Sequence, residues 1–188
     1  MRKVIISHYV TLDGVMEDPG AQDKFKDADW HFRFWSEEVR KFKVDELFAA
    51  DALLLGRLTY EGYADAWPGR TDEDGFAYRI NEMQKYVVST TLSQLTWNNS
   101  QLIKGKLAEE VEKLKQLPGL DILVGGGGSL VRSLMEYDLV DEYRLMVHPI
   151  VVGDGMRLFQ DAKYTPLTLA ETKVFSTGVV VLTYQRII

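Results

Sequence analysis

The sequence contains no cysteine, and its three histidines, His8, His31 and His148, lie far apart along the chain. The absence of cysteine excludes disulfide bonds, thiolate zinc sites and cysteine nucleophiles. The histidines show none of the close spacings found in metal-binding motifs, so we predict no metal site. His8 and His148 fall in predicted strands, where a core histidine is the expected interpretation.

Long apolar runs are absent as well. Met1-Arg2-Lys3 is followed by only three apolar residues, Val4, Ile5 and Ile6, before polar residues return. This pattern predicts neither a signal-peptide core nor a membrane span, so we expect a cytoplasmic protein with no membrane partner.

Basic residues are outnumbered by acidic ones. The chain has 22 Lys and Arg residues against 28 Asp and Glu residues, a formal net charge of −6. A phosphate backbone requires clustered Lys and Arg, so this balance argues against nucleic acid as the main partner. It leaves room for a local basic pocket that binds a single nucleotide.

What is present is typical of a globular protein. The 188 residues are 46% hydrophobic and 27% charged, which are ordinary values for such proteins. The length is sufficient to bury a substantial core, and we expect a single domain over residues 1–188.

Strand and helix patterns alternate through most of the chain. Strand patterns cover 4–10, 52–55, 85–89, 101–103 and 121–124. Helical patterns cover 30–50, the stretch that follows 56–59 and ends at about Trp67, 74–84, 105–116 and the stretch that ends at Tyr137. The pattern over 30–50 weakens at 41–44, so this stretch could be two helices. Residues 142–152, 167–175 and 179–187 are predicted strands with no helix between them. The fold class is therefore α/β, a mostly parallel central sheet flanked by helices with an antiparallel C-terminal hairpin.

Ligands of such sheets bind beyond the carboxyl ends of the strands. Four predicted loops at these ends carry polar or glycine-rich sequences, at 11–14, 56–59, 89–90 and 125–128. Their common position at one edge is a stronger indication of a site than any one of them alone.

The loop with the clearest signal follows the apolar run at 121–124. It reads Gly125, Gly126, Gly127, Gly128, Ser129 and Leu130. Glycines without Cβ atoms let a ligand approach the backbone closely, and free N–H groups at a helix start attract an anion. We therefore predict a phosphate-bearing cofactor here, with a tight turn and close helix–strand packing as the alternative. The spacing fits neither G-x-G-x-x-G nor a Walker A motif.

A second phosphate signal follows the apolar strand pattern at 52–55. Gly56 permits a turn, Arg57 offers a guanidinium group, and Thr59 offers a hydroxyl near a helix start. Ser89 lies beyond the following strand and could contribute a hydroxyl to the same phosphate. If Arg57 and Ser89 share one site, a phosphorylated ribose is favoured, and hence NADPH over NADH. The alternatives are a surface ion pair for Arg57 and a turn cap for Ser89.

Asp13 ends the first strand and precedes Gly14. A carboxylate at this place could hold a substrate hydroxyl or amine, or transfer a proton, so Asp13 is the candidate catalytic residue. The alternative is an Asp-Gly turn.

Five segments together resemble a known superfamily. In order they are 11–14, 54–61, 87–89, 124–130 and 141–155, the last containing Asp141-Glu142-Tyr143 and His148-Pro149. This arrangement resembles the dihydrofolate-reductase-like superfamily. It is most similar to the branch that contains the C-terminal reductase domain of RibD, the bifunctional deaminase–reductase of riboflavin biosynthesis. The resemblance covers nearly the whole chain.

The resemblance implies NADPH as the hydride donor and, often, a homodimer. By position it implies that Gly56, Arg57 and Thr59 hold cofactor phosphates, with Ser89 near the 2′-phosphate. Residues 125–130 would lie against the pyrophosphate and nicotinamide, and Leu12 and Asp13 would border the nicotinamide and substrate. Residues 149–155 would form an edge and subunit contact.

The expected function is that of an NADPH-dependent reductase of a small heterocyclic substrate, like 5-amino-6-(5-phosphoribosylamino)uracil reductase. The deaminase half of the bifunctional enzyme needs cysteine ligands, which are missing here, so a stand-alone reductase domain is expected. Folate reductases place a carboxylate on the helix after the first strand. Asp27, Asp29, Glu37 and Glu38 lie in that stretch, and none aligns clearly. The alternatives are a dihydrofolate reductase and a non-catalytic nucleotide-binding or oligomeric protein.

Overall fold

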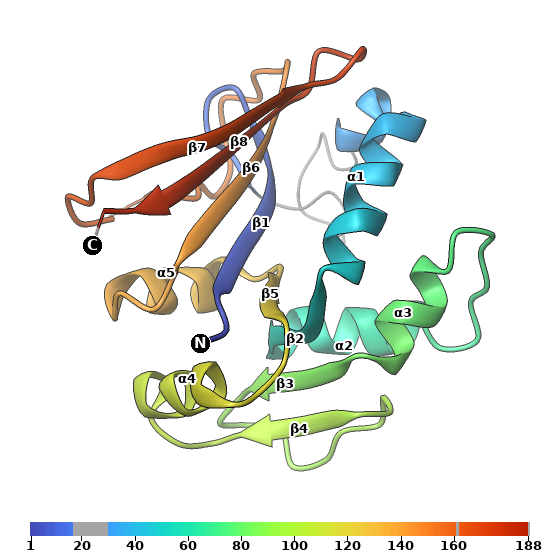
Figure 1. The fold of residues 1–188 in the computed structure, drawn as a ribbon, viewed down its shortest axis with the longest axis vertical. Helices are drawn as coiled ribbons and strands as arrows, with labels where there is room; N and C mark the ends of the chain where they lie inside the picture. Colours follow the sequence, from blue (N-terminus) through green and yellow to red (C-terminus); the bar gives the residue numbers. More distant parts are fainter. Residues whose placement is uncertain (17–29, 161, 188) are drawn as a thin grey trace.

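The computed structural model describes residues 1–16, 30–160 and 162–187 (Figure 1). The strands are β1 (Val4–Thr11), β2 (Ala50–Gly56), β3 (Gln84–Val88), β4 (Ser100–Ile103), β5 (Asp121–Gly125), β6 (Glu142–His148), β7 (Leu167–Val174) and β8 (Val180–Arg186). The helices are the 3-10 helix η1 (Trp30–Phe34), α1 (Glu37–Phe48), α2 (Arg57–Ala66), α3 (Phe76–Glu82), α4 (Leu107–Gln116) and α5 (Gly128–Glu136).

The eight described strands form one sheet in the order β4-β3-β2-β5-β1-β6-β8-β7. The first six strands of that order are all parallel to their neighbours. β8 is antiparallel to both β6 and β7. The predicted fold class is therefore confirmed, including the antiparallel C-terminal hairpin.

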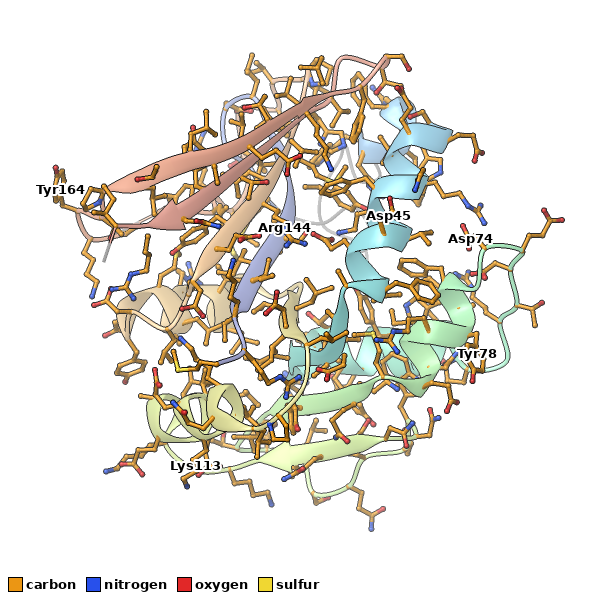
Figure 2. The ribbon with its side chains drawn as sticks, viewed as in Figure 1. Asp45, Asp74, Tyr78, Lys113, Arg144 and Tyr164 are labelled. Atoms are coloured by element: carbon orange, nitrogen blue, oxygen red, sulfur yellow. The ribbon has the colours of Figure 1, made fainter. Side chains whose placement is uncertain are left out.

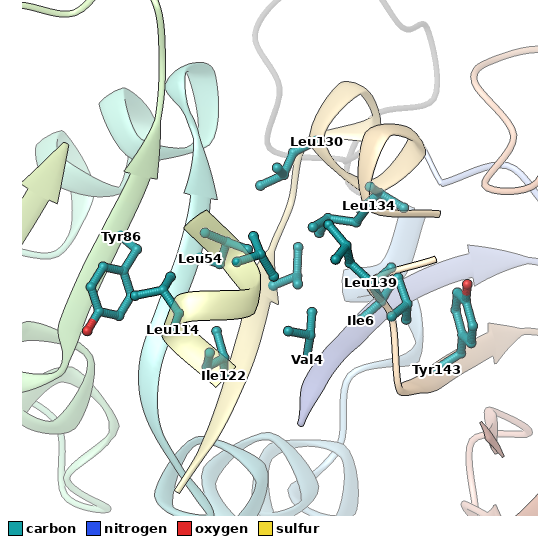
Figure 3. Close-up of a cluster of buried hydrophobic side chains, with 14 of the residues drawn as sticks. Val4, Ile6, Leu54, Tyr86, Leu114, Ile122, Leu130, Leu134, Leu139 and Tyr143 are labelled. Carbon is teal, nitrogen blue, oxygen red and sulfur yellow. The ribbon is translucent and has the colours of Figure 1, made fainter. Parts of the chain in front are cut away.

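Helices cover both faces of the sheet, because the central strands are apolar on both sides. On one face α4 and α5 pack over side chains such as Val4, Ile6, Leu54 and Ile122 (Figure 3). On the other face α2 and α3 pack over the alternate residues of the same strands, for example Leu53 and Leu123. The alternation along β1, β2 and β5 thus places a hydrophobic core on each side.

Helix α1 lies over β6 and β8 and joins the sheet through buried charges. The Glu46 carboxylate accepts hydrogen bonds from Ser7 Oγ at 2.8 Å and from Lys43 Nζ at 2.5 Å. Arg144 of β6 reaches the same carboxylate at 3.2 Å and lies between the sheet and α1 (Figure 2). Burial opposes ionisation of Glu46, but the cations on two sides outweigh it and keep the pKa of this carboxyl below its usual value.

Most boundaries lie within three residues of those predicted, and two features differ by more. The helical stretch 30–50 is interrupted at Trp35 and Ser36 rather than at 41–44, because Ser36 caps α1 by accepting the N–H of Val39 at 3.2 Å. The strand predicted over 142–152 ends at His148. Pro149 follows it, and proline has no N–H to donate to a strand ladder.

None of the helices in the described ranges is long and apolar enough to cross a membrane.

Candidate functional site

The carboxyl ends of six parallel strands lie along one edge of the sheet, which we call the carboxyl edge. β2 and β5 end side by side, where Leu55 pairs with Gly125. β1 and β6 end side by side, where Thr11 pairs with His148. The four loops singled out in the sequence therefore share one edge, as the strand pattern predicts.

Each position of the glycine loop after β5 has a packing reason to be glycine. Gly126 and Gly127 have φ of 53° and 77°, which side-chain-bearing residues rarely adopt. A Cβ atom on Gly125 would lie 2.7 Å from Leu55 Cδ2, and one on Gly126 would lie 2.7 Å from Thr59 Oγ1. A Cβ on Gly128 would collide with Met156 Sδ. Close packing, the alternative interpretation of the glycines, is therefore present in the structure. It does not conflict with a role of the same loop in binding a ligand.

Two helix starts meet beside this loop. α2 begins at Arg57 directly after β2, and α5 begins at Gly128 soon after β5. Leu130 is buried and lies under Gly56, where an added Cβ would be 3.6 Å from Leu130 Cβ, whereas Ser129 is exposed. Because β2 and β5 are neighbours, the positive ends of two helix dipoles face the same part of the carboxyl edge.

Arg57 is exposed and pairs with Glu61 one turn further along α2, at 2.9 Å. Both side chains are more than two-fifths exposed, and such a pair contributes at most about 1 kcal/mol. The surface ion pair proposed as the alternative is present. It holds Arg57 weakly, so the guanidinium group can turn to a ligand.

Ser89 is only 7% exposed. Its Oγ accepts the N–H of Thr91 at 3.2 Å and that of Leu92 at 3.0 Å. The turn-cap alternative therefore describes Ser89 well, and its hydroxyl has little surface left for a phosphate.

Sequence reasoning missed Lys104. The N–H of Ser89 donates to the Ile103 carbonyl at 3.3 Å, which places the end of β4 beside the end of β3. Lys104 comes next and is exposed. It has no ion-pair partner in the described ranges, whereas its neighbour Lys106 pairs with Glu109 at 3.0 Å. No local signal marks Lys104, because its position depends on the pairing of β3 with β4.

Asp13 lies at the end of β1, where its carboxylate is fully engaged. Oδ1 accepts Thr11 Oγ1 at 2.6 Å and the N–H of Val152 at 3.3 Å, and Oδ2 accepts the N–H of Gly153 at 2.8 Å. The Thr11 hydroxyl, together with these N–H groups, lowers the pKa of Asp13 to about 2. The carboxyl is therefore ionised at neutral pH, with no proton to donate.

The other candidate site residues near β1 differ in their exposure and in their hydrogen bonds. Leu12 is 68% exposed, and its N–H donates to the Ile150 carbonyl at 2.9 Å. Asp27 and Asp29 lie outside the described residues. Glu37 is exposed, and Glu38 accepts the N–H of Ser176 at 2.8 Å.

The two strand histidines are buried, as expected. His148 is 1% exposed, and its Nδ1 lies 2.8 Å from the Met146 carbonyl. Burial lowers the pKa of His148, and it lowers the pKa of His8 to about 4. Within residues 1–16, 30–160 and 162–187, no group of three or more His, Asp or Glu side chains could hold a metal ion.

A groove of about 600 Å³ lies away from the carboxyl edge, between α1 and residues 72–74. Several of its charged side chains already have partners. Arg40 pairs with Asp74 at 2.5 Å, and Asp72 accepts the N–H of Ala77 at the start of α3 at 2.6 Å. We therefore place the candidate site at the carboxyl edge, where glycines and helix starts converge.

Comparison with known folds agrees with this topology. A Shewanella sp. PV-4 protein whose name assigns it to riboflavin biosynthesis superposes with a TM-score of 0.78 at 21% identity, covering 98% of this chain and 99% of that one. Dihydrofolate reductase of Enterococcus faecalis, complexed with NADP(H), gives 0.62 at 15% identity, covering 98% and 96%. At such identities the likeness shows the fold alone.

Part of a bifunctional enzyme has the same fold. The diaminohydroxyphosphoribosylaminopyrimidine deaminase/5-amino-6-(5-phosphoribosylamino)uracil reductase of Thermotoga maritima gives a TM-score of 0.67 at 15% identity. The match covers 99% of this chain and 57% of the Thermotoga chain.

Sequence comparison reaches further. The uncharacterized protein YyaP of Bacillus subtilis (strain 168) is 34% identical over 188 residues, which cover 98% of this chain and 95% of YyaP. The family model of the RibD C-terminal domain matches residues 2–181. This match spans nearly the whole chain and includes the parallel sheet and the carboxyl-edge loops described above. The chain therefore belongs to the RibD C-terminal domain family.

Proposed function

We propose that the chain is an NADPH-dependent reductase of a small heterocyclic substrate, similar to 5-amino-6-(5-phosphoribosylamino)uracil reductase. One observation carries the proposal: the neighbouring strands β2 and β5 bring the starts of α2 and α5 together at the carboxyl edge, against a glycine loop. Two helix starts and a Cβ-free backbone suit a pyrophosphate. Membership of a reductase-domain family supports the same assignment.

Each part of the site has a role in this proposal. Residues 125–130 and the α2 start at Gly56, Arg57 and Thr59 would hold the cofactor phosphates by N–H groups, a hydroxyl and a guanidinium group. NADPH would supply the hydride when bound. Leu12, exposed at the end of β1, would offer an apolar surface beside the nicotinamide. Because Asp13 is ionised and internally bonded, we assign the substrate proton to solvent.

The first test is nucleotide selectivity. At about a hundredfold excess over its Kd, a ligand stabilises a protein by about 2.7 kcal/mol, or about 5–10 °C in Tm at this size. NADPH should raise the Tm by this amount and NADH by much less, because Arg57 can meet the 2′-phosphate. Arg57→Ala should weaken NADPH binding and leave NADH binding unchanged. Equal shifts from the two nucleotides in the wild-type protein would contradict the phosphate assignment.

Substrate assignment needs a second measurement. Oxidation of NADPH would be followed at its nicotinamide absorbance with a panel that includes dihydrofolate and the ribosylaminopyrimidine. Turnover of dihydrofolate alone would favour the dihydrofolate reductase alternative. NADPH binding without turnover of any compound would favour a nucleotide-binding protein.

We further propose that the chain forms a homodimer. β7 is one of the two edge strands of the described sheet, and seven of its eight residues are exposed. Leu169 and Val174 of β7 are 49% and 71% exposed, and Tyr164 projects beside the start of this strand (Figure 2). Val151, in the segment expected to contact a second subunit, is 66% exposed. A stable interface needs about 800 Å² per partner, and light scattering after gel filtration would show a mass near twice that of one chain.

A further inference from the structure

The loop after β1 and the segment after β6 are joined along their length. The N–H of Leu12 donates to Ile150, that of Met16 donates to Met156 at 2.8 Å, and that of Leu158 donates to Gly14 at 3.1 Å. Val15 and Arg157 form an isolated antiparallel bridge. Residues 12–16 and 150–158, which we call the clasp, therefore act as one structural unit although more than 130 positions separate them.

Two charged side chains close the clasp. The Asp13 carboxylate accepts the N–H groups of Val152 and Gly153. From the opposite side, Arg157 Nε donates to the Asp13 carbonyl at 3.2 Å, and Arg157 Nη2 donates to the Gly153 carbonyl at 3.2 Å. The two side chains lie 3.9 Å apart. Gly153 has φ of 86°, so the turn that presents these groups needs glycine.

The far end of the clasp reaches the glycine loop. The carbonyl of Met156 accepts a hydrogen bond from the N–H of Met16. The Sδ of Met156 occupies the space that a Cβ on Gly128 would need. Gly128 is the first residue of α5, whose start faces the proposed nucleotide site. A chain of contacts thus runs from Asp13 through Met156 to the backbone that would cradle the cofactor.

We propose that Asp13 is a positioning residue for nucleotide binding: by holding residues 150–157 on β1, it seats Met156 against Gly128 and fixes the glycine loop in its binding conformation. The proposal rests on the proposed function for the identity of the ligand. It assigns Asp13 a role in place of the proton transfer considered from the sequence. The ligand class is a dinucleotide that meets the loop through its pyrophosphate.

Hydrogen exchange of the ligand-free protein tests the first link. Asp13→Ala removes three accepted hydrogen bonds, so amide exchange over 125–130 should rise although Asp13 is remote in sequence. Asp154→Ala is the matched control, because Asp154 lies in the same segment and, among the described residues, its carboxylate accepts only the N–H of its neighbour Gly155, at 2.9 Å. Wild-type exchange over 125–130 in Asp13→Ala would overturn the proposal, as would an equal rise in Asp154→Ala.

Nucleotide affinity tests the second link. Asp13→Ala should raise the Kd for NADPH about tenfold, because ordering the released loop would cost about as much free energy as one hydrogen bond to a charged group. Asp13→Asn should be intermediate, because its oxygen can still accept the N–H of Gly153. Each Kd is measured well below the Tm of its variant, which separates this graded rescue from a general loss of stability. A wild-type Kd in Asp13→Ala would overturn the proposal.

A pair of substitutions tests the contact itself. Gly128→Ala should weaken NADPH binding because its methyl group displaces Met156, and Met156→Ala in the same protein should restore binding. If the double variant binds as poorly as Gly128→Ala, the glycine serves the ligand directly and the proposal is wrong. If the wild-type protein binds no nucleotide, the proposed function fails, and exchange over 125–130 still decides whether the clasp controls the loop. Arg157→Ala provides the exchange comparison if Asp13→Ala does not fold.

Discussion

The carboxyl edge has two unlike halves. Around β1, β5 and β6, the clasp and the glycine loop are held by contacts with one another, from Asp13 to Gly153 and from Met156 to Gly128. Around β2, β3 and β4, Arg57 and Lys104 are exposed cations with weak partners or none in the described ranges. The half around β1, β5 and β6, which we call the held half, can contribute shape to a binding site. The half around β2, β3 and β4, which we call the open half, can contribute positive charge. A polar residue at a strand end is thus assigned a role by its partners rather than by its position.

The largest effect should come from the held half, through Gly126. Gly126→Ala must place a side chain at φ of 53° and within 2.7 Å of Thr59 Oγ1, so we expect a loss of about 2–3 kcal/mol in the free energy of unfolding. Denaturant unfolding measures it. Gly62→Ala is the matched control: beyond its own helical turns, no atom of the described residues lies within 4 Å of its Cβ position in α2, and alanine there should stabilise by about 1 kcal/mol. Similar losses of unfolding free energy at both positions would show that the glycine loop is no more constrained than the middle of α2.

The held half should also respond to pH through His8 of β1. Burial lowers the pKa of His8 from 6.5 to about 4, so the folded state favours the neutral ring. Stability from this group is complete above pH 6.5 and falls as pH drops towards 4, with about 2 kcal/mol lost between pH 7.5 and 5. Unfolding curves of wild type and His8→Gln would measure it. Parallel pH profiles for the two proteins would show that His8 contributes nothing.

The smallest effect, and one without a stability component, is expected from the open half. Lys104 follows β4 beside Ser89, so Lys104→Ala should raise the Kd for NADPH several-fold, leave that for NADH unchanged and keep the Tm of the free protein. Lys106→Ala is the control, because Lys106 already pairs with Glu109. Equal effects of the two substitutions would assign the loss to general charge. A lowered Tm would give the open half a structural role.

Local pattern was sufficient for most of the fold. The spacing of apolar residues predicted the alternation of strands and helices up to β6 and the C-terminal hairpin. Both depend on the pattern of buried residues within short stretches of sequence. It misplaced the break before α1, where the capping of Val39 by Ser36 outweighed the weak periodicity of 41–44.

The site was less predictable because its contacts are not local. The sequence led us to expect that residues 11–14, 56–59 and 125–128 share an edge, and they do. It could not show that Lys104 lies beside Ser89, which depends on the pairing of β3 with β4. Nor could it show that Met156 lies on Gly128. The catalytic role of Asp13 stays a prediction. Its backbone partners, Val152 and Gly153, lie too far along the chain to be inferred from local sequence.

The position of β5 has a consequence for how the chain folds. Residues 121–125 occupy the centre of the sheet, between β1 and β2, although those strands end before residue 57. Neither β1 nor β2 can complete its ladder until β5 arrives. During synthesis β2 waits with one edge open after β3 has formed, and β1 waits with both edges open because β6 follows β5. Pairings between segments this distant slow folding, and an open parallel edge invites association with other chains. Refolding should therefore be limited by the insertion of β5.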